Sequence, residues 1–141
     1  MSTAFETVYT IGDWYDGPRE GAADFRGVPH RYRSVYLDAP EWNPDEDRFE
    51  LTPISAELLT AMLEADRLWR RWDDARRAGT LPEMPEDVPR VLPEDRPRYA
   101  ALTADIDAEL AGRIPTILVH GIFQYRPDRV QWTPVETFPA A

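Results

Sequence analysis

The stretch DWYDGPREG, positions 13–21, gathers residues that could do chemistry, because the aromatic Trp14 and Tyr15 stand between two aspartates. A carboxyl group held against aromatic rings loses water, which raises its pKa and suits it to acid–base catalysis. The same stretch also fits a tight turn, since Asp16-Gly17 is a preferred turn pair and a proline follows it. We predict that the stretch is mainly a turn.

A small-ligand or enzymatic pocket in the mouth of a curled sheet is the alternative hypothesis for this region. Its candidate ligand-binding residues are Trp14, Tyr15, Asp16, Arg19 and His30. Such a site requires polar groups that converge in an apolar cleft. The strand that carries Trp14 would present Asp16 on the same face if it extends that far, and His30 begins a nearby strand.

The string ILVHG, positions 117–121, is typical of the strand that leads into the oxyanion loop of α/β-hydrolases. The rest of that machinery is missing, because none of the three serines stands in a G-x-S-x-G motif. The chain also lacks the alternating strand and helix pattern of a parallel sheet. We therefore expect His120 to be an edge or half-buried strand residue, and we predict no catalytic residue.

Metal ligands are sparse in this sequence. His30 and His120 stand ninety positions apart, so no short-spaced histidine pair exists. Asn43, Asp45 and Asp47 alternate as in a calcium loop, but an arginine and an isoleucine occupy the places of the required glycine and bidentate glutamate. The chain has no cysteine, which excludes a disulfide, a thiolate nucleophile and a cysteine-bound metal. We predict neither a metal site nor a cofactor.

Three tryptophans are candidates for contact with a partner. The segment 67–77, RLWRRWDDARR, interleaves opposite charges at a spacing of four, which favours a solvated helix face with ion pairs over an anion-binding surface. The two tryptophans of this segment are core candidates first, and an exposed one would anchor a partner. The partner-binding candidates are Trp42, Trp69 and Trp72.

Composition limits the classes of partner. The 141 residues carry 26 acids and 16 bases, a formal net charge of -10, and every base is an arginine. An acidic field repels phosphate backbones and anionic lipid, so we expect no nucleic acid and no membrane as partner. No apolar run approaches the roughly 20 residues that cross a bilayer, and no signal peptide is recognisable, so we expect a cytoplasmic protein.

Proline positions and hydrophobic periodicity predict one domain over residues 1–141. Strands are expected at 5–11, at two places within 21–37 that join at Gly27-Val28-Pro29, and at 47–53, 114–125 and 130–135. Helices are expected from about Ser55 to Ala78 and from about 95–97 to Ala111, with a proline-rich loop at about 80–95 between them.

The first predicted helix has the strongest pattern, because its apolar residues recur at spacings of three and four. Ser55 is expected to cap its free N–H groups, and Ile54 and Leu59 occupy the two positions of a hydrophobic staple. Gly79 is placed to leave the helix in the left-handed conformation.

The elements together predict an α+β fold. It is a curled antiparallel sheet of five or six strands with two helices packed on one face, in the order four strands, two helices, two strands. The segment 114–125 is apolar on both alternating faces, which predicts a strand buried on both sides. A type I turn is expected at 126–129.

Four segments together resemble a family of uncharacterised bacterial proteins. They are WYDGPREGAADFRGVPH (14–30), RFELTPI (48–54), WRRW (69–72) and QWTP (131–134). The family shares a motif close to WYDGPxxGxAxFxGxPH and carries no assigned activity or ligand. The resemblance implies a single bacterial domain and transfers no functional residue.

The leading hypothesis for function is a soluble, non-catalytic interaction protein. It would present an acidic surface with aromatic side chains to a protein partner of basic or mixed charge. The hypothesis depends on the net charge of -10, the five tryptophans and the lack of a catalytic constellation in the sequence.

Overall fold

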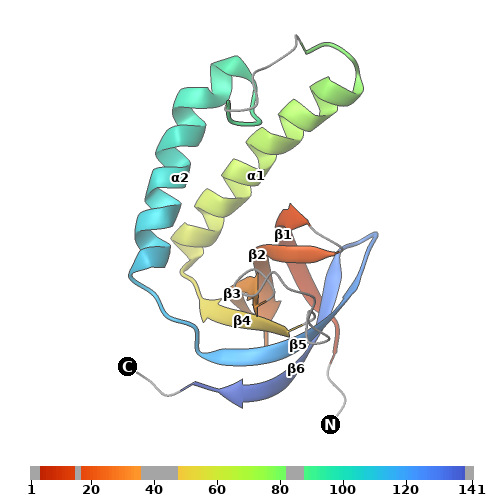
Figure 1. Cartoon of the computed structure of the whole chain (residues 1–141), viewed down its shortest axis with the longest axis vertical. Coiled ribbons are helices and arrows are strands. Elements are labelled where there is room, and N and C mark those ends of the chain that lie inside the picture. The colour runs from red at the N-terminus through yellow and green to blue at the C-terminus, as the bar shows by residue number, and fades with distance from the viewer. Residues whose placement is uncertain (1–3, 15–16, 36–47, 82–87, 139–141) are drawn as a thin grey trace.

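The chain folds into a six-stranded antiparallel β-barrel with a helical hairpin between its fourth and fifth strands (Figure 1). The computed structural model describes residues 4–14, 17–35, 48–81 and 88–138. The strands are β1 (Glu6–Trp14), β2 (Pro18–Phe25), β3 (Val28–Ser34), β4 (Arg48–Pro53), β5 (Ile117–Gln124) and β6 (Arg129–Thr137). The helices are α1 (Ala56–Arg77), the short 3-10 helix η2 (Pro93–Asp95) and α2 (Arg96–Ala111).

The predicted order of four strands, two helices and two strands is confirmed, and the sheet is a closed barrel. Each strand pairs with the next, and β6 returns to β1 through Glu6↔Val130 and Thr7↔Arg129. Register shifts within the β1–β2 and β5–β6 ladders mark bulges or irregularities. Bulges bend a strand and increase its twist, and they supply the curvature that closes a sheet into a barrel.

Aromatic side chains fill the interior of the barrel. The rings of Tyr32, Phe49, Phe123 and Trp132 have centroids 5.5 to 5.8 Å apart in every pairing. A Cβ atom at Gly121 would lie 2.5 Å from the Trp132 ring, so this strand position requires a glycine. The centre of the barrel is therefore a packed core.

The α1 helix begins and ends where the sequence predicts. The Ser55 hydroxyl accepts a hydrogen bond from the backbone N–H of Leu58 at 3.1 Å, as a helix cap does. Ile54 and Leu59 belong to one apolar cluster, as the two ends of a staple should. Gly79 has a φ of +71°, the left-handed conformation expected after the last turn.

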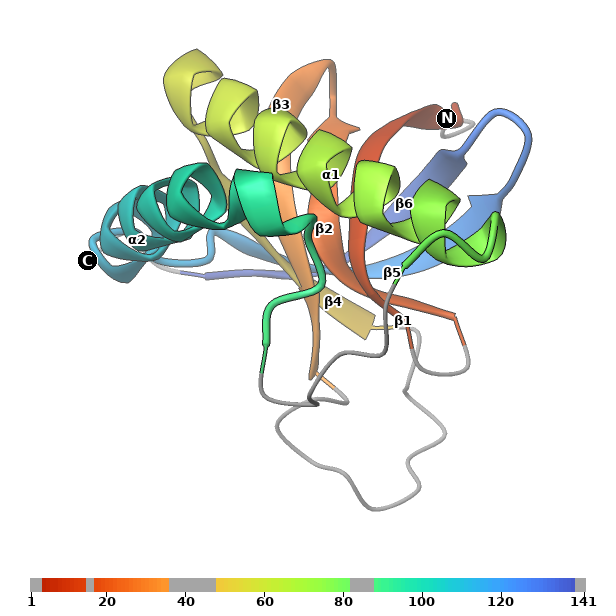
Figure 2. The same ribbon diagram turned by 90° about the horizontal axis from the view of Figure 1, so that it is seen from above.

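The helical hairpin packs on the outside of the barrel (Figure 2). The first turns of α1 contact Tyr9 of β1 and Ala22 of β2, and the last turns of α2 join the same cluster. A second cluster holds the helices together at their other end, and Val91 from the predicted proline-rich loop is fully buried in it. Burial of Val91 could not be predicted from the sequence, because so short an apolar stretch between prolines has no periodicity.

The prediction that the segment of β5 is buried on both sides is wrong. The strand has only one buried face, since Ile122 on its outer face is 57% exposed. Closure of the barrel explains this difference, because the helices pack on one side of the barrel and most of β5 lies on the side away from them (Figure 1). Arg126, at the start of the turn into β6, has a φ of 65°. The type I turn expected at 126–129 stays a prediction, because its type is defined by the backbone angles of the two central residues, Pro127 and Asp128.

Candidate functional site

Trp14 and His30, two of the five residues of the predicted ligand site, lie far apart along the barrel. Trp14 lies at the end of β1, where it pairs with Pro18, whereas His30 pairs with Ala23 on β3. Five residues of β2 separate these two rungs, about 17 Å at roughly 3.3 Å per residue. Arg19 follows Pro18 and is 1% exposed.

Two of these candidates, Tyr15 and Asp16, lie outside the described residues, as does Trp42 among the partner-binding candidates. The turn prediction for this stretch agrees with the flanking backbone. The β1 strand ends at Trp14, β2 begins at Pro18, and Gly17 between them has a φ of 123°.

The contacts of the His30 side chain indicate a structural role. Its Nδ1–H donates a hydrogen bond to the Val28 carbonyl at 2.8 Å, and its ring meets the Phe25 ring edge-on at 5.4 Å. Burial lowers the pKa of His30, and the hydrogen bond and the nearby carboxylates of Glu6 and Asp24 only partly oppose this. The ring is therefore neutral at pH 7 and stabilises the β2–β3 hairpin.

The two histidines do not meet. His30 pairs with Pro53 and His120 pairs with Arg48, at opposite ends of β4. Five positions along this strand separate the rungs, about 17 Å. Among the described residues no group of three His, Asp or Glu side chains is arranged to hold a metal ion.

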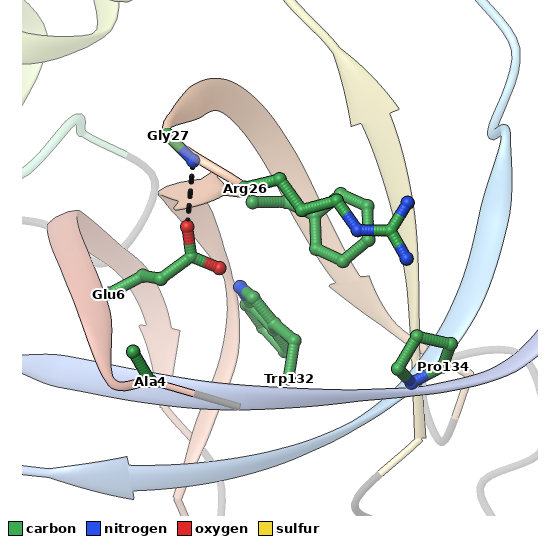
Figure 3. A pocket seen from close by; sticks show the side chains of 7 residues that line it. Ala4, Glu6, Arg26, Gly27, Trp132 and Pro134 are labelled. Carbon is green, nitrogen blue, oxygen red and sulfur yellow. Dashed lines mark hydrogen bonds between the residues drawn. The ribbon is translucent and has the colours of Figure 1, made fainter. Parts of the chain in front are cut away.

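A shallow pocket of about 280 Å³ lies at one mouth of the barrel, beside the β2–β3 turn (Figure 3). Trp132 lies between Glu6 on one side and Arg26 and Pro134 on the other. The Glu6 carboxylate accepts a hydrogen bond from the Gly27 backbone N–H at 2.8 Å. The complete lining is Ala4, Glu6, Phe25, Arg26, Gly27, Trp132 and Pro134. None of these residues was a candidate from the sequence, because three separate segments supply them.

An exposed aromatic pair lies on a different part of the barrel. The rings of Trp14 and Tyr125 have centroids 5.7 Å apart and are tilted by 51°. Trp14 is 58% exposed and Tyr125 is 47% exposed. Typical anchors of protein interfaces are large aromatic side chains that stay open to solvent and pack against each other.

Carboxylates accompany this aromatic pair. Asp128 follows Tyr125 in the β5–β6 turn, and its backbone carbonyl accepts a hydrogen bond from the Val8 N–H at 3.3 Å, which ties the turn to β1. Burial, with a smaller contribution from Asp128, raises the pKa of Tyr125, so its phenol stays protonated at neutral pH. We call Trp14, Tyr125 and Asp128 the Trp14 surface.

Asp66 of α1 is a further carboxylate whose pKa responds to Asp128. Its carboxylate accepts a hydrogen bond from Arg70 Nε at 2.7 Å and is largely buried. Burial raises the pKa of Asp66, the bond from Arg70 opposes that rise, and the negative charge of Asp128 adds to it. The electrostatic influence of Asp128 therefore extends to Asp66 of α1.

Trp69 and Trp72 of α1 have different environments. Trp72 is half-buried, and guanidinium groups of Arg76 and Arg90 lie 5.6 and 5.9 Å from its ring. Trp69 is 39% exposed, and it stands three positions after Asp66, on the same side of the helix. Of the two, Trp69 therefore remains a partner-binding candidate.

The excess of negative charge is unevenly distributed along the sequence. The segments 15–16, 36–47 and 82–87 contain nine acids and no arginine, so the described residues carry 17 acids and 16 arginines. Many of the described charges form pairs, such as Arg98 of α2 with Glu64 of α1 at 2.6 Å. A site on the described surface must therefore depend on local charges, because the described part is close to neutral.

Comparison of the chain with models of protein families, with curated proteins and with solved structures gave no match. Neither described helix has the length and apolar character needed to cross a membrane. The function must accordingly be inferred from the geometry of the described surface.

Proposed function

We propose that the protein is a non-catalytic binding module that holds a basic segment of a protein partner against the Trp14 surface. The observation that carries this proposal is the contact between two exposed rings, Trp14 and Tyr125, beside the carboxylate of Asp128. A guanidinium or ammonium group attracts both an aromatic face and a carboxylate, so one cationic side chain can use all three residues.

The neighbouring charges favour a partner of basic or mixed charge. The negative charge of Asp128 raises the pKa of Asp66, so a cation bound beside Asp128 would offset part of the repulsion between the two carboxylates. In the sequence, Asp13 and Asp16 flank Trp14 as well. Arg126 of the same turn has the opposite charge and would pair with an acid of the partner.

The geometry requires little rearrangement on binding. The Trp14 ring is fixed by Tyr125, and the turn that carries Tyr125 is tied to β1 by the Val8–Asp128 hydrogen bond. Aromatic side chains that are already ordered lose little conformational entropy when a partner binds. This supports Trp14 as the residue that contributes most to affinity.

Titration with the peptides GRGRG and GEGEG tests the proposal. The arginine peptide should bind, and Trp14→Ala should weaken its binding at least about tenfold, since aromatic hot spots contribute about 2 kcal/mol or more. The matched control is Ile114→Ala, which shortens another exposed apolar side chain. Equal affinities for wild type and Trp14→Ala would refute the proposal, because the substitution leaves the net charge unchanged.

A second pair of variants distinguishes the effect of the Asp128 carboxylate from the effect of the overall negative charge. Asp128→Asn should weaken binding of GRGRG severalfold. Asp107→Asn, on an exposed position of α2, changes the net charge by the same amount and should leave the affinity nearly unchanged. Equal losses in both variants would mean that the peptide follows the overall charge rather than the Trp14 surface.

A further inference from the structure

The pocket at the barrel mouth has a chemistry of its own, independent of the Trp14 surface. It lies beside the β2–β3 turn, whereas Trp14 lies where β1 passes into β2, at the other end of these strands. Its floor is apolar, because the rings of Phe25 and Trp132 and the side chain of Pro134 line it. The inference that follows goes beyond the proposed function.

Glu6 is held in place on one side of this pocket. Its Oε1 accepts the hydrogen bond from the Gly27 N–H, and its second oxygen is turned toward Trp132 (Figure 3). The Trp132 Nε1–H is already used, because it donates to the Asp24 carbonyl at 2.9 Å. The second oxygen of Glu6 can therefore accept a hydrogen bond from a bound molecule.

Arg26 lies on the other side of the pocket. Its backbone φ of 54°, followed by a φ of 75° at Gly27, makes the tight two-residue turn that carries it. The guanidinium lies over the Phe25 ring, with Cζ 4.7 Å from the ring centroid. No ion pair among the described residues joins Arg26 to Glu6, and Figure 3 shows the two charged groups on opposite sides of Trp132.

We infer that this pocket binds a small zwitterion with an apolar body, of the class of free apolar α-amino acids. The ammonium group would donate to the second oxygen of Glu6, and the carboxylate would accept from the Arg26 guanidinium. The side chain would then lie against Trp132 and Pro134. A volume of about 280 Å³ is at the lower limit of small-molecule pockets, which suits a single amino acid and not a nucleotide.

Opposite charges across an apolar floor distinguish a zwitterion from a simple ion. A ligand with one charge would pair with either Glu6 or Arg26 and would leave the other without a partner from the ligand. Loss of one charge-assisted hydrogen bond commonly weakens binding about tenfold or more. The pocket should therefore prefer an amino acid to the corresponding amine or acid.

NMR titration of the protein with six free amino acids tests the inference. The amino acids are alanine, valine, leucine, methionine, phenylalanine and tryptophan. At least one should shift the backbone amides of Glu6 and Gly27 and the indole N–H of Trp132. For phenylalanine as probe, phenethylamine and 3-phenylpropionate should bind about tenfold more weakly. If none of the six binds at about 10 mM, or if a singly charged analogue binds as well as its amino acid, the inference is wrong.

Two variants test which residue binds each charged group of the ligand. Glu6→Gln keeps an oxygen that can accept from Gly27 and so preserves the turn, yet it should weaken binding of the amino acid about tenfold, as should Arg26→Gln. The charge-matched controls Glu57→Gln and Arg67→Gln on α1 should have no effect. Equal binding by Glu6→Gln and wild type, or by Arg26→Gln and wild type, would refute the assignment. A negative result in this test does not affect the Trp14 proposal, because that proposal is tested with a different ligand, a peptide, and with variants of different residues.

Discussion

The rings of Trp14 and Tyr125 lie 5.7 Å apart although 111 positions separate them in the sequence. Closure of the barrel brings them together, because β6 returns to β1 and carries the β5–β6 turn with it. The surface proposed for a partner is thus a consequence of topology. It exists only when the first and last strands of the chain are paired.

Gly121 tests how tightly the barrel is filled. Gly121→Ala should destabilise the protein by about 1 to 3 kcal/mol, because its Cβ would lie 2.5 Å from the Trp132 ring and 3.1 Å from the Phe49 ring. Gly112→Ala is the control, since its Cβ would meet only the Glu109 carbonyl at 3.8 Å. Denaturant unfolding measures both. Equal stability of the two variants would mean that the barrel core has room to spare.

Ser55 tests the cap that starts α1. Ser55→Ala removes the oxygen that accepts from the Leu58 N–H and should lower the free energy of unfolding by about 1 kcal/mol. Thr60→Ala also removes a hydroxyl, but one on an exposed position inside the helix, where alanine is the better helix former. Thermal melts should therefore show a lower Tm for the first variant alone.

Asp66 should make the folded state less favourable as the pH rises. Its pKa is raised by burial and by Asp128, so its contribution is present in full below the ordinary pKa of about 3.8 and is lost as the pH rises through the higher folded value. Arg70 only partly opposes this loss. Asp66→Asn should gain stability relative to wild type between about pH 3.5 and pH 7 in urea titrations. If the difference in unfolding free energy between Asp66→Asn and wild type stays the same across this pH range, the carboxylate is not buried.

The contribution of His30 to stability should change with pH in the opposite direction to that of Asp66. Its pKa is lowered by burial, so its contribution is present in full above the ordinary pKa of 6.5 and is lost as the pH falls toward the lower folded value. Wild type should accordingly lose more stability than His30→Gln between pH 7 and about pH 5. An NMR titration of the His30 ring checks the cause directly. A midpoint at or above 6.5 would show that the ring is open to water.

The elements could be predicted from the sequence because each has a local cause. The apolar spacing of α1 and the capping position of Ser55 give its bounds to within about a residue. The closed barrel could not be predicted, since closure depends on two rungs between β1 and β6 that leave no local pattern. The exposed face of β5 was missed for the same reason, because apolar residues such as Ile122 do not reveal which side of a barrel they occupy.

The candidate sites were harder to predict than the fold. The sequence makes Trp14 a candidate for ligand binding and not for partner contact, because Tyr125 and the carboxylate of Asp128 come from a turn near the other end of the chain. The pocket at the barrel mouth joins Glu6, the Arg26-Gly27 turn and Trp132 from three segments. Pairing of distant strands creates both sites, so residue types in one stretch could not reveal them.

The most direct test of the proposed function is an NMR map of the GRGRG peptide on the wild-type protein. We predict that the indole N–H of Trp14 and the backbone amides of Tyr125 and Asp128 shift together and saturate with one affinity. Shifts that spread over the acidic segments 36–47 and 82–87 while the Trp14 resonance stays in place would contradict it.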